Sequence, residues 1–252
     1  MASAHLIVRG DNFGLSHAAN QAVEEAFETG ILTCASLAVV GPWVAEAAAL
    51  SHGHPEWEVG LQLLLHCLPG GCRWGPVAGP AVVPSLVDAT GQFPPAVAAT
   101  ATAEDVDREL AAQLERARAW GLQPAYVEYT GSPHPAVAPA LHRLSEHFGV
   151  PAGMTSWDIQ PLPLPPGPLS AAVLLDTLAA LSVGAYLWVT HPAHDAPESW
   201  ALWGEDETPR SQQIETDLLC DASVRAGLDE RGIELMSFRQ QLEIRLGAGT
   251  SD

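Results

Sequence analysis

Two residues able to transfer protons stand at the ends of buried, strand-like segments of this sequence. Asp11 ends the segment that begins at Leu6, and His191 follows the apolar segment 185–190. Because parallel α/β proteins bind ligands at the carboxyl ends of their strands, both side chains are predicted to face a site. A carboxylate and an imidazole in one pocket can act as a base and an acid. For Asp11, the alternative is a cap on the turn that follows.

Further polar and aromatic residues lie at predicted strand ends or in the loops beyond them. A polar side chain inside an apolar strand, such as Gln62, needs a hydrogen-bonding partner. The candidates for substrate contacts are Asn12, Gln62, His66, Glu128, Tyr129, His134, Trp200, Trp203 and Arg210. For His134, which prolines flank, a plain turn residue is the alternative. Packing against the fold is the alternative for the loop tryptophans, which are Trp74, Trp157, Trp200 and Trp203.

Apolar strand-like segments alternate with helical segments about seven times along the chain. Strands are predicted at residues 6–11, 35–41, 57–65, 124–128, 150–155, 185–190 and 233–238, and the main helices at 17–30, 103–121, 136–148, 169–183 and 211–231. This pattern predicts an α/β fold, a single-domain (β/α) barrel of residues 1–252 that is incomplete, with seven strands. A doubly wound sheet is the alternative. The loops 68–98 and 193–210 are predicted to line the site.

The composition restricts the partners of the chain. A formal net charge of -19 over 252 residues opposes binding to nucleic acid or to an anionic membrane surface. All 11 basic residues are arginine, which excludes the lysine-dependent Schiff-base, pyridoxal-phosphate and phosphate-loop chemistries. We expect a small-molecule substrate, no nucleic-acid partner and no membrane partner, and a homodimer is compatible with the sequence.

The start of the sequence, its apolar runs and its cysteines indicate the cellular compartment of the protein. No charged-then-apolar leader opens the sequence and no apolar run is long enough to span a bilayer, so a cytoplasmic location is predicted. Four cysteines do not make a disulfide framework in a chain of this kind. The richness in Ala, Arg, Gly and Pro is typical of a high-GC bacterial source.

Several separated segments resemble the YdjC/ChbG-type carbohydrate deacetylases. LIVRGDNFGLS is similar to that family's LIVNADDFGLS, GILTCASLAVVGP to GILTSTSLMVNGP, and EVGLQLLL to its strand carrying Gly-Leu-His-Leu. The segment 189–193 resembles its Cys-His-Pro-Gly segment, Pro209–Arg210 its Pro-Arg pair, and ERGIELMSFR its C-terminal strand. The resemblance covers nearly the whole chain and implies an incomplete (β/α)7 barrel that removes N-acetyl groups from amino sugars.

The resemblance also implies a divalent metal, whose ligands are altered here. The family's ligands are the second acid of Asp-Asp, the His of Gly-Leu-His-Leu and a His of an Asp-Ser-His-x-His-x-His loop. The matching positions hold Asn12, Gln62 and the segment 128–134, in which only His134 remains. Because amides bind hard cations less well than carboxylates or imidazoles do, we predict no metal and no other cofactor. Asp11 matches the family's proposed base, His191 its His-Pro histidine, and Arg210 a residue that orients the site.

Three functions are compatible with these residues. The preferred hypothesis is a metal-independent enzyme in which Asp11 and His191 catalyse elimination, isomerisation or cyclisation of a small organic molecule, in specialised metabolism. One alternative is a metal-dependent carbohydrate N-deacetylase with a rearranged metal site. The other is a non-catalytic binding protein that kept the fold.

Overall fold

The computed structural model describes residues 4–68, 72–152, 158–204 and 208–248. Its centre is a parallel sheet of seven strands, which are β1 (Ala4–Phe13), β2 (Cys34–Leu37), β3 (Val59–Leu63), β4 (Val127–Tyr129), β5 (Ile159–Pro161), β6 (Gly184–Thr190) and β7 (Glu234–Leu235). Their order is β4-β3-β2-β1-β6-β5, and β7 pairs with the start of β1. Over the described residues no pairing joins β4 to β5, so the curled sheet stays open. The predicted incomplete barrel is confirmed.

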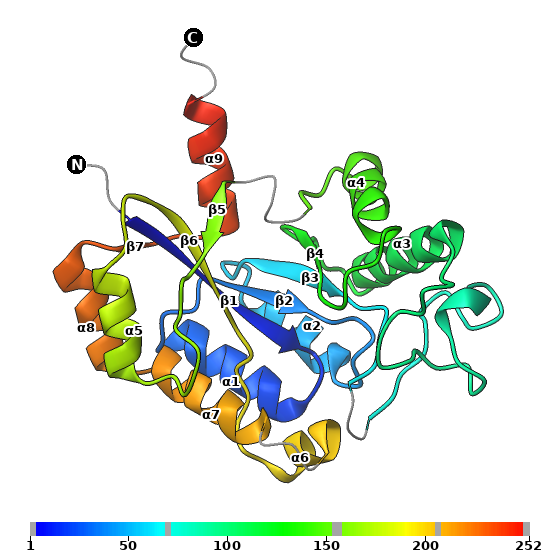
Figure 1. The fold of residues 1–252 in the computed structure, drawn as a ribbon, viewed down its shortest axis with the longest axis horizontal. Helices are drawn as coiled ribbons and strands as arrows, with labels where there is room; N and C mark the ends of the chain where they lie inside the picture. Colours follow the sequence, from blue (N-terminus) through cyan, green and yellow to red (C-terminus); the bar gives the residue numbers. More distant parts are fainter. Residues whose placement is uncertain (1–3, 69–71, 153–157, 205–207, 249–252) are drawn as a thin grey trace.

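Most of the helices connect the strands and cover the outer face of the sheet, whereas the last helix, which begins at Phe238, packs against the inner side (Figure 1). The helices are α1 (His17–Glu28), α2 (Val44–Gly53), α3 (Ala103–Ala119), α4 (Val137–Phe148), α5 (Ala171–Ala179), α6 (Pro197–Trp203), α7 (Thr208–Leu219), α8 (Ala222–Arg231) and α9 (Phe238–Ala248), with a short 3-10 helix at Pro84–Leu86. Figure 1 shows α1, α7 and α8 grouped on one side and α3 and α4 on another. None of the helices in the described ranges is both long and apolar enough to cross a membrane.

Several predicted elements differ from the observed ones. The fifth strand of the sheet is β5, where no strand was predicted, and the predicted loop 193–210 contains α6 and the start of α7. The strand expected at 150–155 is reduced to a single bridge between Ala152 and Val127, and residues 153–157 lie outside the described part. The helix expected at 211–231 is two helices, because Asp221 accepts a hydrogen bond from the Ser223 N–H (2.7 Å) and caps a new one. The last strand is only two residues long, and α9 follows it.

Side chains of β1 alternate between two cores. Leu6 and Val8 belong to the large core under the helices, whereas Ile7 packs inside the curled sheet with Tyr126 and Phe238. Since residues two apart on a strand share a face, the inner face of β1 continues from Ile7 to positions 9 and 11. The inside of the sheet is therefore apolar at the amino ends of the strands and polar at their carboxyl ends.

The predicted loop 68–98 is tied to α3 by buried polar groups. The Glu109 carboxylate accepts hydrogen bonds from the N–H groups of Val77 and Ala78, both at 2.9 Å. Trp74 and Phe93 of this loop are buried in the large core, so Trp74 packs against the fold, as its alternative proposed. These contacts make the loop part of the scaffold, and its role in lining the site stays a prediction.

Candidate active site

The carboxyl end of β1 carries a buried ion pair between Arg9 and Asp11. Arg9 donates from Nε to Asp11 Oδ1 (2.8 Å) and from Nη2 to Oδ2 (3.0 Å). Arg9 is 4% and Asp11 0% exposed. Burial by itself would lower the pKa of Arg9, but attraction to Asp11 and neighbouring groups outweighs it and raises that pKa further. The guanidinium is thus a permanent positive charge inside the sheet.

Arg9 also faces Glu128, which projects from the end of β4. Arg9 Nη1 lies 3.9 Å from Glu128 Oε2, in an ion pair that is long for a hydrogen bond. Within the described residues Nη1 is buried without a hydrogen-bond partner. One guanidinium therefore stands between two carboxylates that belong to different strands.

Asn12 and Gln62 form an amide pair across β1 and β3. The Asn12 backbone N–H donates to Gln62 Oε1 (2.8 Å), and Gln62 Nε2 donates to Asn12 Oδ1 (3.3 Å). Asn12 has a φ of 70°, in the left-handed region where Asn is tolerated. Its Nδ2 is buried and has no hydrogen-bond partner in the part of the chain that is described. Gln62 thus has the partner that its place in an apolar strand requires.

His191 lies directly after β6 and is held by an acid from α7. Its backbone N–H donates to Glu215 Oε2, and its Nδ1 lies 3.6 Å from the same oxygen. Burial acts to lower the pKa of His191, but Glu215 and the charge of Asp11 outweigh it and raise that pKa. The side chain keeps 41% of its surface exposed, so solvent and substrate can reach it.

The pairing of β1 with β6 brings the two proton-transfer groups close together. Gly10 pairs with Thr190, so Asp11 and His191 each follow one member of that pair. The Thr190 hydroxyl donates to the carbonyl oxygen of Arg9 (3.0 Å) and fixes the two strand ends. The predicted acid–base pair therefore lies on neighbouring strands at one end of the sheet.

Two further candidates meet beyond the ends of β3 and β4. A Cβ on Gly131 would lie 2.6 Å from Tyr129 Oη and 2.9 Å from His66 Nδ1, so both side chains lie against Gly131. Burial lowers the pKa of His66 and raises the pKa of Tyr129 to about 12. Both side chains are consequently neutral near pH 7 and suited to hydrogen bonding.

The remaining candidates belong to other local structures. His134 Nδ1 accepts from the Ala136 N–H (3.3 Å) just before α4, as expected for a turn residue. The Trp200 Nε1 donates to Asp195 (2.6 Å), and the Arg210 guanidinium lies 5.3 Å from the centre of its ring. Trp203 is half-buried against the large core, and Trp157 lies outside the described residues.

Two residues of this site were missed by the sequence analysis. The sequence held a usable signal for Arg9, because a residue two positions before Asp11 on the same strand lies on the same face of the sheet as Asp11. Glu215 had none, since it lies on a helix 24 positions after His191 and only the fold brings it close.

The residues at the carboxyl end of the sheet do not fit the divalent metal that the family resemblance implies. Asn12 and Gln62 are hydrogen-bonded to each other, and both oxygens of Asp11 accept from Arg9. Arg9 Nη1 and Asn12 Nδ2, which are left without a partner there, are N–H donors, which need an acceptor and repel a cation; His66 Nδ1, beyond the end of β3, is also without a partner among the described residues and is a single ring nitrogen. His134 is engaged in its own turn.

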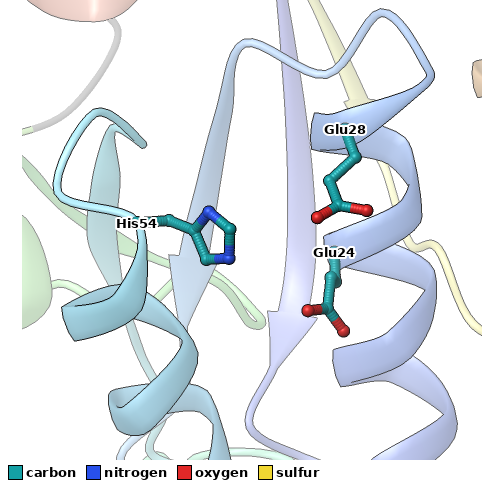
Figure 2. Close-up of side chains that lie close together, drawn as sticks. All are labelled: Glu24, Glu28 and His54. Atoms are coloured by element: carbon teal, nitrogen blue, oxygen red, sulfur yellow. The ribbon is translucent and has the colours of Figure 1, made fainter.

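One group of three metal-ligating side chains does occur among the described residues, at another place. Glu24 and Glu28 on α1 and His54 after α2 have ligand atoms within 4.8 Å of one another (Figure 2). Because α1 runs back from the carboxyl end of β1, its last turns lie toward the amino ends of the strands. This group is therefore remote from Asp11 and His191.

Comparisons with known proteins agree with this fold. The model of the family described as YdjC-like protein matches residues 5–230. A carbohydrate deacetylase of Geobacillus stearothermophilus is 31% identical over 94% of this chain and 97% of its own length. A chitooligosaccharide deacetylase of Serratia marcescens is 30% identical over 59% of this chain and 57% of its own length. A crystal structure from Enterococcus faecalis V583, of a protein named for cellobiose-phosphate cleavage, shares the fold with a TM-score of 0.80, 20% identity and coverage of 94% and 98%.

These findings correct the preferred functional hypothesis. An enzyme of the lyase, isomerase or cyclase type was predicted because the metal ligands are replaced, but relatives matched over 97% of their own length are named carbohydrate deacetylases. The hypothesis gave the lost ligands more weight than the many separated segments that are retained. This chain belongs to the YdjC-like protein family.

Proposed function

We propose that this protein is a carbohydrate deacetylase, a hydrolase that removes the N-acetyl group from an amino sugar. The observation that carries the proposal is the full-length similarity to a carbohydrate deacetylase. The adjoining Asp11 and His191 support it, because they supply at one end of the sheet the base and the acid that amide hydrolysis requires.

In this reaction water adds to the acetyl carbonyl carbon, the C–N bond breaks, and the amine leaves with a proton. Asp11 orients and deprotonates the water, because each of its oxygens keeps a lone pair beyond the one used by Arg9. His191, with its raised pKa, donates the proton to the leaving amine. Asn12 Nδ2, a buried N–H without a hydrogen-bond partner among the described residues, donates to the acetyl oxygen as negative charge develops there.

The other candidates contact the sugar around this centre in our proposal. His66, Glu128 and Tyr129 line the side formed by β3 and β4, where the Tyr129 hydroxyl donates to the Ser132 carbonyl oxygen (3.1 Å). Trp200 and Arg210 stand on α6 and α7, and a tryptophan face can stack on a sugar ring.

A panel of acetylated sugars tests the proposal. The purified protein is incubated with N-acetylglucosamine, its short β-linked oligomers and an O-acetylated sugar, and free acetate and free amine are both quantified. We expect acetate and amine in equal amounts from at least one N-acetylated sugar. No acetate from any N-acetylated sugar that the protein binds, as measured by calorimetry, would contradict the proposal.

The pH dependence of the reaction tests the role of His191. Because its pKa is raised above the ordinary value of about 6.5, the protonated acid is present below that raised pKa and is lost as the pH rises through it. The rate should therefore fall on the alkaline side, above about pH 6.5. Glu215→Gln removes the neighbouring negative charge and should move this fall to lower pH by on the order of one unit.

The matched control for this profile is Gln213→Glu, which adds an acid on the same helix at a residue that bonds the Asp195 N–H instead of His191. The rate of this variant should fall at the same pH as the rate of the unchanged protein. An unchanged fall in Glu215→Gln would show that another group is the acid.

A further inference from the structure

The positive charge at the carboxyl end of β1 is part of the chain itself. Arg9 is 4% exposed and donates to both oxygens of Asp11, at 2.8 and 3.0 Å. A guanidinium stays protonated at any pH at which the protein is folded, so it cannot give way to a cation by losing its proton. A metal ion that bonded to Asp11 would have to displace this pair or share an oxygen with it.

Glu128 strengthens the hold on Arg9 from a second strand. Its carboxylate lies 3.9 Å from Arg9 Nη1, on the side that Asp11 leaves open. The guanidinium is therefore flanked by two carboxylates, and its charge offsets one of their two negative charges inside the sheet. Moving Arg9 aside would separate it from both acids at once and leave their charges without a partner.

The polar atoms around Arg9 favour an acceptor over a cation. Asn12 and Gln62 use their facing oxygens on each other. Beyond the end of β3, His66 Nδ1 is buried without a hydrogen-bond partner among the described residues. Next to the ion pair, Arg9 Nη1 and Asn12 Nδ2 also lack a partner among these residues, and both are donors. A carbonyl or carboxylate oxygen satisfies such atoms, whereas a cation leaves them unsatisfied and repels them.

We propose that the buried guanidinium of Arg9 is the resident cation of this site, and that by holding Asp11 and Glu128 it excludes a divalent metal ion. The inference concerns cation binding and does not depend on the reaction. Restoring an acidic ligand at position 12 and an imidazole ligand at position 62 is therefore not sufficient for metal binding while Arg9 remains.

Metal uptake by a series of variants tests this inference. The unchanged protein, Asn12→Asp/Gln62→His, and Arg9→Asn/Asn12→Asp/Gln62→His are equilibrated with ZnCl2, desalted, and analysed for zinc per chain by mass spectrometry, with titration calorimetry for affinity. All three also carry Glu24→Gln and Glu28→Gln, so that the group in Figure 2 cannot contribute zinc, and in this series the unchanged protein is the chain with these two substitutions alone. Circular dichroism confirms that each is folded.

We expect about one zinc ion per chain only in the variant that lacks Arg9, and less than roughly a tenth of an ion in the other two. If that variant does not fold, Arg9→Met/Asn12→Asp/Gln62→His, which keeps the side-chain bulk, takes its place with the same expectation. Stoichiometric zinc in the unchanged protein, or in Asn12→Asp/Gln62→His, would overturn the inference. Acetate release is measured separately, so failure of the proposed deacetylation would leave this result unaffected.

Discussion

Replacing His191 with alanine is expected to lower kcat/KM for deacetylation by about 100- to 10,000-fold, the range for losing a general acid. The imidazole is placed beside Asp11 by the pairing of β6 with β1 and is held by Glu215. Without it the amine must leave unprotonated or take its proton from water. The loss should appear mainly in kcat, because the proton is transferred in the transition state and not on binding.

His194→Ala is the matched control for this variant. His194 lies three residues further along the same segment, but its imidazole is 3.4 Å from Glu25 on α1. Its removal should change kcat/KM by less than about threefold, the scale of a surface substitution of roughly 0.5 kcal/mol. Equal losses in the two variants would mean that His191 acts on the segment's structure and not as an acid.

Replacing Arg9 with methionine is expected to lower the free energy of unfolding by about 3–5 kcal/mol. Methionine fills a similar space but leaves Asp11 buried without its two hydrogen bonds and Glu128 without the nearby charge. An uncompensated buried carboxylate is costly, because it loses its hydration and gains no partner. Urea unfolding followed by circular dichroism gives the difference.

Two further variants distinguish the loss of this buried ion pair from the effect of removing any arginine on the free energy of unfolding. Arg143→Met removes a bidentate pair with Asp107 on the surface, with contacts of 2.8 and 2.9 Å, and should cost less than about 1 kcal/mol. Arg9→Met/Asp11→Asn removes the stranded charge and should recover part of the loss. A loss in Arg9→Met no larger than in Arg143→Met would show that the buried pair adds little to stability.

Local sequence signals predicted much of the fold because local physics decides it. The helix predicted to start at residue 17 does start there, because the Ser16 hydroxyl accepts from the Ala19 N–H at 3.0 Å and caps it. The helix predicted at 103–121 is α3, which ends two residues earlier at Ala119; acids in its first turn and arginines in its last turn favour a helix there. The break at Asp221 was missed, because the break contains neither glycine nor proline and depends on a side-chain cap.

The sequence predicted the residues of the candidate site that lie in or directly after apolar strands, but not the partners of these residues. Asp11, Gln62 and His191 were found because each stands out from an apolar strand, and the structure brings Asp11 and His191 to adjoining strands. The partners of these residues depend on the fold: Asn12 for Gln62 across 50 positions and Glu215 for His191 across 24. Arg9 could have been found from its spacing, but its meaning depends on Glu128 from β4.

The central claim is that Arg9 occupies the charged position beside Asp11 that a metal ion would otherwise take. Crystals of the unchanged protein soaked in MnCl2 and in ZnCl2, with anomalous diffraction measured at the edge of each metal, test it most directly. We predict the guanidinium on both oxygens of Asp11 and no anomalous peak within bonding distance of that carboxylate. A peak there, with Arg9 turned away, would contradict the account.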